Sequence, residues 1–198
     1  MNTDKCSIHK MYCGDGVLYG LNKTLLKINH EYMMIQYYSL EATDVEVLRW
    51  SRNGNTPTVA AFEGLQADEK AMILDYLKNL PTHAEICLGS KSFYLVHGFL
   101  GENDHDKVWT RPDLQSDNPV HGMTLIIGHT PVINMIVSRE SRDMYCEDLI
   151  NRGEHPRILR ADGFIDIDCC CSYSEPIKTL GCLRLDDMEE FYESTLCR

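Results

Sequence analysis

The segment LIIGHTP, residues 125–131, is an apolar run that stops at a glycine followed by His129. The run over 123–127 is typical of a buried β-strand. A second segment, YLVHG at 94–98, again places a histidine, His97, and a glycine at the end of an apolar run. In layered α/β folds, ligands bind where strands end. Each histidine alone fits a packed, hydrogen-bonded residue better, but two of them beside glycines favour a shared metal site.

Helices are predicted in the first third of the chain and short strands in the rest. The clearest helix spans 67–80, where apolar residues recur at helical spacing and Pro81 ends the pattern. Shorter helices are predicted at 30–40 and 44–51, and a further helical turn at Thr56-Pro57. The predicted strands are 84–88, 92–96, 123–127, 132–137, 158–159, 164–167 and 179–185. Because the chain has no internal repeat and no linker, residues 1–198 are predicted to form one α/β domain with a layered sheet core.

The composition is that of an acidic globular chain of 198 residues, in which 30 Asp and Glu against 19 Lys and Arg give a formal charge of −11. This charge disfavours nonspecific binding to nucleic acid or to an anionic membrane, although a metal ion can invert the local charge for a phosphate substrate. No apolar run approaches the ~20 residues of a membrane span. The first ten residues lack the apolar core of a secretion signal. We therefore expect a cytoplasmic protein without nucleic-acid or membrane partners.

The nine cysteines include three in a row, Cys169, Cys170 and Cys171. Their odd number and the absence of a CxxC pair fit reduced thiols better than a disulfide framework. Metal binding by the triple cysteine is the less favoured alternative, because tetrahedral sites normally draw their ligands from two separated pairs.

A third polar segment, INHEY at 28–32, places Asn29, His30 and Glu31 side by side at the start of a predicted helix. An amide oxygen from this segment and the two strand-end imidazoles form a mixed oxygen and nitrogen set that suits Mn, Fe or Zn. The adjacent His30 could donate a proton to a leaving oxygen.

Further short motifs follow one another in order along the chain. After NHE at 29–31 come WSRNGN at 50–55, LP at 80–81, VHG at 96–98, VWTR at 108–111, GHTP at 128–131, and IDIDC at 165–169 with CLRLD at 182–186. From about residue 25 to 192, this order resembles the calcineurin-like metallophosphoesterases, and most closely the bacterial branch of the serine/threonine protein phosphatases. The order of the motifs, more than any one of them, supports the resemblance.

The resemblance implies a layered α/β/β/α sandwich that is N-terminally incomplete, with residues 1–24 atypical and 25–192 family-like. It implies hydrolysis of phosphate monoesters, with phosphoserine or phosphothreonine in a protein as the first expectation. A small phosphate ester or a dinucleoside polyphosphate is the alternative substrate. The cofactors implied are divalent metal ions, Mn first and Fe, Zn or Mg as alternatives.

The resemblance also assigns roles to single residues. Three match ligands of the second metal: Asn29, His97 and His129. His30 matches the general acid, and Glu31 either supports it or is an exposed residue at a helix start. Arg111 matches a phosphate-binding position, and a surface arginine in an ion pair is the equally weighted alternative. The remaining histidines considered match no motif and are predicted to lie on the surface: His83, His105, His121 and His155.

Two motifs of the family are absent from these 198 residues. In the family, GDxHG supplies an Asp and a His as ligands of the first metal, and GDxxDRG supplies the Asp that bridges both metals. This sequence holds no Asp-x-His and no Asp-Arg-Gly. Gly14-Asp15 opens like the second motif without completing it, and Ile28 and Phe99 replace smaller family residues. Because a two-metal site needs those carboxylates, the chain alone is expected to bind at most one divalent ion, weakly, with negligible activity. The alternatives are a catalytically dead remnant, or an accessory binding protein completed by a second polypeptide.

Overall fold

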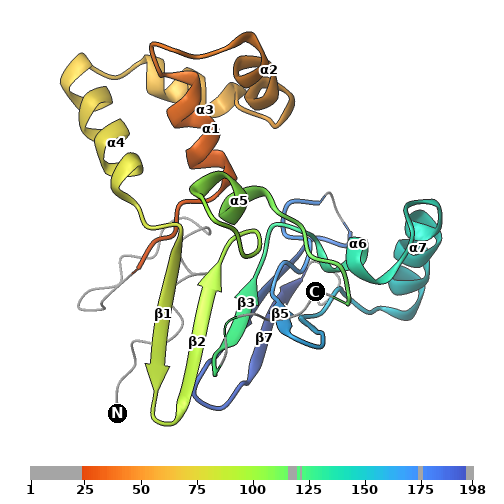
Figure 1. The fold of residues 1–198 in the computed structure, drawn as a ribbon. Helices are drawn as coiled ribbons and strands as arrows, with labels where there is room; N and C mark the ends of the chain where they lie inside the picture. Colours follow the sequence, from red (N-terminus) through yellow and green to blue (C-terminus); the bar gives the residue numbers. More distant parts are fainter. Residues whose placement is uncertain (1–23, 116–119, 121, 174–175, 195–198) are drawn as a thin grey trace.

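The computed structural model describes residues 24–115, 120, 122–173 and 176–194, and shows a mixed α/β protein (Figure 1). Five strands form a mixed sheet in the order β1-β2-β3-β5-β4, and two more form a small sheet, β6-β7. The strands are β1 His83–Leu88, β2 Lys91–Val96, β3 Thr124–Ile127, β4 Leu159–Arg160, β5 Phe164–Asp166, β6 Thr179–Leu183 and β7 Glu190–Ser194. Gly14-Asp15 and His121 lie outside the described residues.

The three inner strands of the large sheet run parallel. Leu95 of β2 pairs with Ile126 of β3, which pairs with Ile165 of β5. The outer strands β1 and β4 are antiparallel to β2 and β5. The carboxyl ends of β2, β3 and β5 therefore meet at one edge of the sheet, and the chain leaves each strand there.

Helices surround this edge. They are α1 Asn29–Tyr37, α2 Asp44–Arg52, α3 Thr56–Glu63, α4 Ala67–Asn79, α5 Asp104–Trp109, α6 Val132–Ile136 and α7 Arg142–Arg152, with a 3-10 turn at Arg139–Ser141. Figure 1 shows α1 to α4 grouped beyond the ends of β1 and β2, with α5 beneath α1. The helix ends follow local chemistry. Thr43 and Glu46 cap α2 reciprocally, and α7 ends at Gly153, whose φ of 65° is left-handed.

The two faces of the large sheet have separate cores. On one face Leu95, Ile126 and Ile165 pack with Leu183 and Leu185 of the small-sheet region. The other face is built around three buried side chains, Tyr94, Leu125 and Phe164. The first four helices have their own core around Trp50, whose side chain is 1% exposed among Met33, Met34 and Phe62. The three inner strands, β2, β3 and β5, thus alternate their side chains between two apolar layers, as a covered sheet requires.

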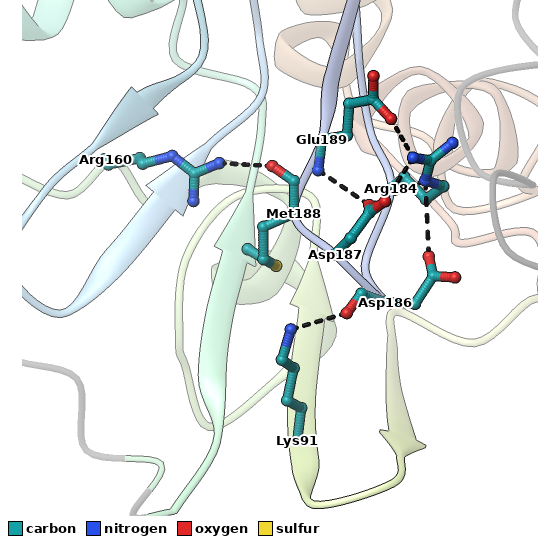
Figure 2. A network of polar contacts seen from close by, with 7 residues as sticks. All are labelled: Lys91, Arg160, Arg184, Asp186, Asp187, Met188 and Glu189. Atoms are coloured by element: carbon teal, nitrogen blue, oxygen red, sulfur yellow. Dashed lines mark hydrogen bonds and ion pairs between the residues drawn. The ribbon is translucent and has the colours of Figure 1, made fainter.

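A polar network joins the large sheet to the turn of the β6–β7 hairpin (Figure 2). Lys91 Nζ donates to the carbonyl of Asp186 at 2.8 Å, and Arg160 Nη2 donates to the carbonyl of Met188 at 3.1 Å. Arg184 pairs with the carboxylates of Asp187 and Glu189. These pairs are exposed, so each adds little to stability, but together they tie the β1–β2 turn and β4 to the β6–β7 hairpin.

Most of the predicted helices and strands are confirmed, but one predicted strand is a helix. Residues 132–137, predicted as a strand, form helix α6 instead. Because β3 is already flanked by β2 and β5, a following strand would have no ladder to join, and a helical turn satisfies its own backbone groups. The sequence patterns also missed three elements: α5, α7 and β7.

Two further findings bear on the expected environment of the protein. Among the helices that the structure describes, none has the length and apolar character needed to span a membrane. Among the cysteines that the structure describes, Cys87, Cys146, Cys169 and Cys170 are free thiols. Cys182 on β6 is disulfide-bonded, so the expectation of reduced thiols is wrong for this residue.

Candidate functional site

The site lies where β2 and β3 end. His97 follows the last residue of β2, and His129 comes two residues after the last residue of β3. The backbone N–H of Gly128 donates to the carbonyl of His97 at 3.0 Å, which ties the two strand ends together. Because the strands are parallel neighbours, both histidines emerge at the same edge of the sheet.

Asn29 and the two histidines come together at this edge. Asn29, buried at the first position of α1, has its Oδ1 3.2 Å from Nε2 of His97. The ring centroids of His97 and His129 are 4.9 Å apart. Two atoms that each lie about 2.1 Å from one metal ion are separated by about 3.0–3.4 Å. The Asn29–His97 contact therefore has the spacing of a ligand pair.

His129 is held in a conformation that few residues adopt. Its φ is 65°, in the left-handed region that costs a non-glycine residue about 1 kcal/mol or more. Its Nε2 is buried and has no hydrogen-bond partner within the described part of the chain. A buried nitrogen without a partner is itself unfavourable. Strain and an unsatisfied nitrogen at one residue are typical of a ligand-binding position, and a metal ion would satisfy this nitrogen.

Both imidazoles are kept neutral by their surroundings. Burial, followed by the nearby His129, His30 and Arg111, lowers the pKa of His97 to about 3. Burial, followed by Arg111 and His30, lowers the pKa of His129 to about 4. Neutral imidazole is the form that binds a metal ion, so these residues need not lose a proton first.

The neutral state of His97 gives a pH-dependent contribution to stability. In the unfolded chain the imidazole takes up a proton as the pH falls through its ordinary pKa of 6.5, whereas the folded state does so only near 3. Lowering the pH from 7 to 5 therefore destabilises the fold by about 2 kcal/mol through this residue. In His97→Gln this part of the loss should disappear. Urea unfolding of both proteins at the two pH values, in chelator, checks it, and an equal pH dependence would contradict it.

His30 and Arg111 lie beside the three converging residues. Both act electrostatically on His97 and His129, and both side chains are exposed. Nη1 of Arg111 donates to Oγ1 of Thr130 at 3.4 Å. Within the described residues Arg111 forms no ion pair with a carboxylate, so the alternative of a surface arginine in an ion pair is not what the structure shows.

Glu31 caps the helix that carries Asn29. Its carboxylate accepts a hydrogen bond at 3.0 Å from the backbone N–H of Ile28. The contact fixes the first turn of α1 and hence the placement of Asn29. The histidines outside the site are partly as predicted: His105 is exposed, whereas His83 and His155 are half-buried against the rings of Tyr94 and Tyr192.

The third parallel strand brings two carboxyl groups that the sequence analysis did not assign. Asp168 follows β5, and its carbonyl accepts a hydrogen bond at 3.0 Å from Val132, just beyond the GHTP segment. Burial raises the pKa of Asp168, while a bond from the N–H of Cys170 and the charge of Arg111 oppose the rise. Asp166 is fully buried, and burial raises its pKa to about 8. The signal available in the sequence was an Asp directly after an apolar strand, as for the histidines.

The three candidate metal ligands, Asn29, His97 and His129, carry no negative charge. Across residues 24–115, 120, 122–173 and 176–194, no group of three or more His, Cys, Asp or Glu side chains is arranged to hold a metal ion. The alternative of a metal site in the triple cysteine thus gains no support, since Cys169 and Cys170 are buried in separate apolar clusters. A metal ion at the candidate site would rest on two imidazoles and the amide of Asn29.

No protein-family model matches the chain, and no curated protein sequence matches it either.

Proposed function

We propose that this chain carries a phosphate-ester site of the calcineurin-like metallophosphoesterase kind, in an incomplete form of that family's layered α/β/β/α sandwich. The observation that carries the proposal is the convergence of Asn29, His97 and His129 at the ends of two parallel strands. They come from segments that are far apart in the sequence, and a shared ligand would account for the meeting of all three, whereas the hydrogen bond between Asn29 and His97 joins only two of them.

The donor atoms fit a divalent ion, with Mn as the first choice and Fe, Zn or Mg as alternatives. When bound, such an ion polarises a phosphoryl oxygen and lowers the pKa of a water molecule. Asn29, His97 and His129 would hold it. Because all three are neutral, the charge of the ion stays uncompensated, and its affinity should be low.

The exposed side chains around these ligands suit a phosphate monoester. Arg111, oriented by Thr130, offers N–H groups to phosphoryl oxygens. His30 stands next to Asn29 at the start of α1, where it can hand a proton to the leaving oxygen of the ester. The substrate class proposed is phosphoserine or phosphothreonine in a protein, with a small phosphate ester or a dinucleoside polyphosphate as the alternative.

A second candidate function is binding of the phosphate ester without turnover. The three ligands include no carboxylate, and two metal ions need several anionic ligands to sit close together. On this basis the chain alone should bind at most one divalent ion and show negligible phosphatase activity. A partner polypeptide, or a fusion that supplies GDxHG and GDxxDRG, should restore it.

The test uses p-nitrophenyl phosphate and a phosphoserine peptide with Mn²⁺. Turnover that His30→Ala abolishes would support hydrolysis by this chain. Peptide binding that needs Mn²⁺, with no turnover, would support the binding function and is the expected result. A folded protein that neither binds nor hydrolyses either compound at any Mn²⁺ concentration would contradict the proposal.

A further inference from the structure

A second cationic side chain, Arg49 on α2, lies close to the candidate site. Its Cζ is 5.7 Å from the centroid of the Trp109 ring. The centroid of that ring is 5.6 Å from the centroid of the His129 ring, with the two planes at 89°. Arg49 is thus one aromatic ring away from a candidate metal ligand, although it belongs to a different helix and a distant part of the sequence.

Arg49 and Arg111, like Arg52, Arg139 and Arg142, form no ion pair with a carboxylate among the described residues, and of these arginines Arg49 and Arg111 contact residues around the candidate site. Four other arginines each pair with a carboxylate: Arg152, Arg157, Arg160 and Arg184. Arg111 also acts electrostatically on His97 and His129, and an arginine without a carboxylate partner can attract an anion even in a chain with a net charge of −11.

We propose that Arg49 binds a second negative charge of the substrate, a carboxylate close to the phosphorylated residue, so that the site selects acidic phosphopeptides. This inference rests on the proposed function, in which Arg111 takes the phosphoryl group. The ring of Trp109 supports the guanidinium of Arg49 from one side by a cation–π contact. No described residue forms an ion pair with the guanidinium of Arg49, and its edge can form a bidentate pair with a carboxylate.

The placement of the two arginines favours a peptide over a polyphosphate. Arg49 contacts Trp109, whereas Arg111 contacts Thr130, next to His129. The ring of Trp109 lies between Arg49 and the ring of His129. A phosphoserine and a neighbouring Glu carry their charges on separate side chains, so one charge can reach each arginine.

The experiment measures the binding of two fluorescent phosphoserine peptides, identical except for Glu or Gln beside the phosphoserine, in Mn²⁺. Wild-type protein should bind the Glu peptide about tenfold more tightly, as expected for a charge-assisted hydrogen bond. Arg49→Gln should remove this preference and leave binding of the Gln peptide unchanged. Arg49→Lys should keep part of it. Arg52→Gln, an exposed arginine on the same helix, is the control and should keep it all.

The outcomes separate this inference from the proposed function. If wild-type protein binds both peptides equally, or if Arg49→Gln weakens both equally, the role of Arg49 is wrong while the phosphate site stands. If Arg49→Gln weakens a dinucleoside polyphosphate and not the Glu peptide, the peptide assignment is wrong. If neither peptide binds to wild-type protein, both the inference and the proposed function fail.

Discussion

His97→Ala is expected to weaken Mn²⁺ binding by about 100-fold or more, since even residues that only support a metal ligand cost about 10- to 100-fold. His97 is the central member of the set, because its Nε2 meets Asn29 and its ring meets His129. With only three neutral donors, the loss of one leaves too few to compete with water. Calorimetric titration of both proteins measures the difference.

The control for this variant is His155→Ala, which removes a half-buried histidine that packs on the ring of Tyr192 of β7 and should leave Mn²⁺ binding unchanged. Two outcomes would count against the account. One is an equal effect of the two variants. The other is two tightly bound ions per wild-type chain together with phosphatase turnover that His97→Ala removes, which would mean that further ligands exist.

Gly98→Ala is expected to destabilise the fold by about 1–3 kcal/mol, the usual cost of forcing a methyl group into packed surroundings. A Cβ at this position would lie 2.9 Å from the carbonyl oxygen of Lys107 and 3.0 Å from that of Thr110. Both belong to backbone at the end of α5, which cannot rotate away as a side chain can. The N–H of Gly98 also donates to the carbonyl of Lys107 at 2.8 Å.

The same substitution should weaken Mn²⁺ binding, because α5 carries Trp109, whose ring packs on His129. Gly128→Ala is the matched control. It lies next to His129, yet its Cβ would meet nothing closer than 3.8 Å, so stability and binding should stay close to wild type. Chemical denaturation and calorimetry test both variants. Equal behaviour of the two glycines would show that the packing of Gly98 against α5 does not hold the site.

The residues at strand ends could be predicted from sequence because the pattern is local. An apolar run that stops at His97 or His129 predicts both the strand and the residue at which it ends. Because the two strands pair in parallel, the two histidines then lie at the same edge of the sheet. Helix α6 could not be predicted in this way, since its type depends on β3 having neighbours on both sides. Its apolar residues Val132 and Ile133 suit a buried strand equally well.

Other parts of the site depend on contacts between distant segments. Arg49 reaches Trp109 because α2 and α5 both pack on α1, and no spacing within either helix shows it. Asp168 had a local signal, an acidic residue after a buried strand, but its closeness to Arg111 follows from the order of β3 and β5 in the sheet. The family resemblance pointed to Asn29, His97 and His129, but not to Arg49 or Asp168.

The central claim is that Asn29, His97 and His129 hold one divalent ion. The most direct measurement is an NMR titration of the histidine ring protons with Mn²⁺, whose paramagnetism broadens signals near the ion. We predict that the signals of His97 and His129 broaden first and together, and that the signal of His83, which lies opposite Val96 on the neighbouring strand, broadens only at higher Mn²⁺ concentrations. Broadening that spares His97 and His129, or that centres on the acidic hairpin around Asp187 and Glu189, would contradict the claim.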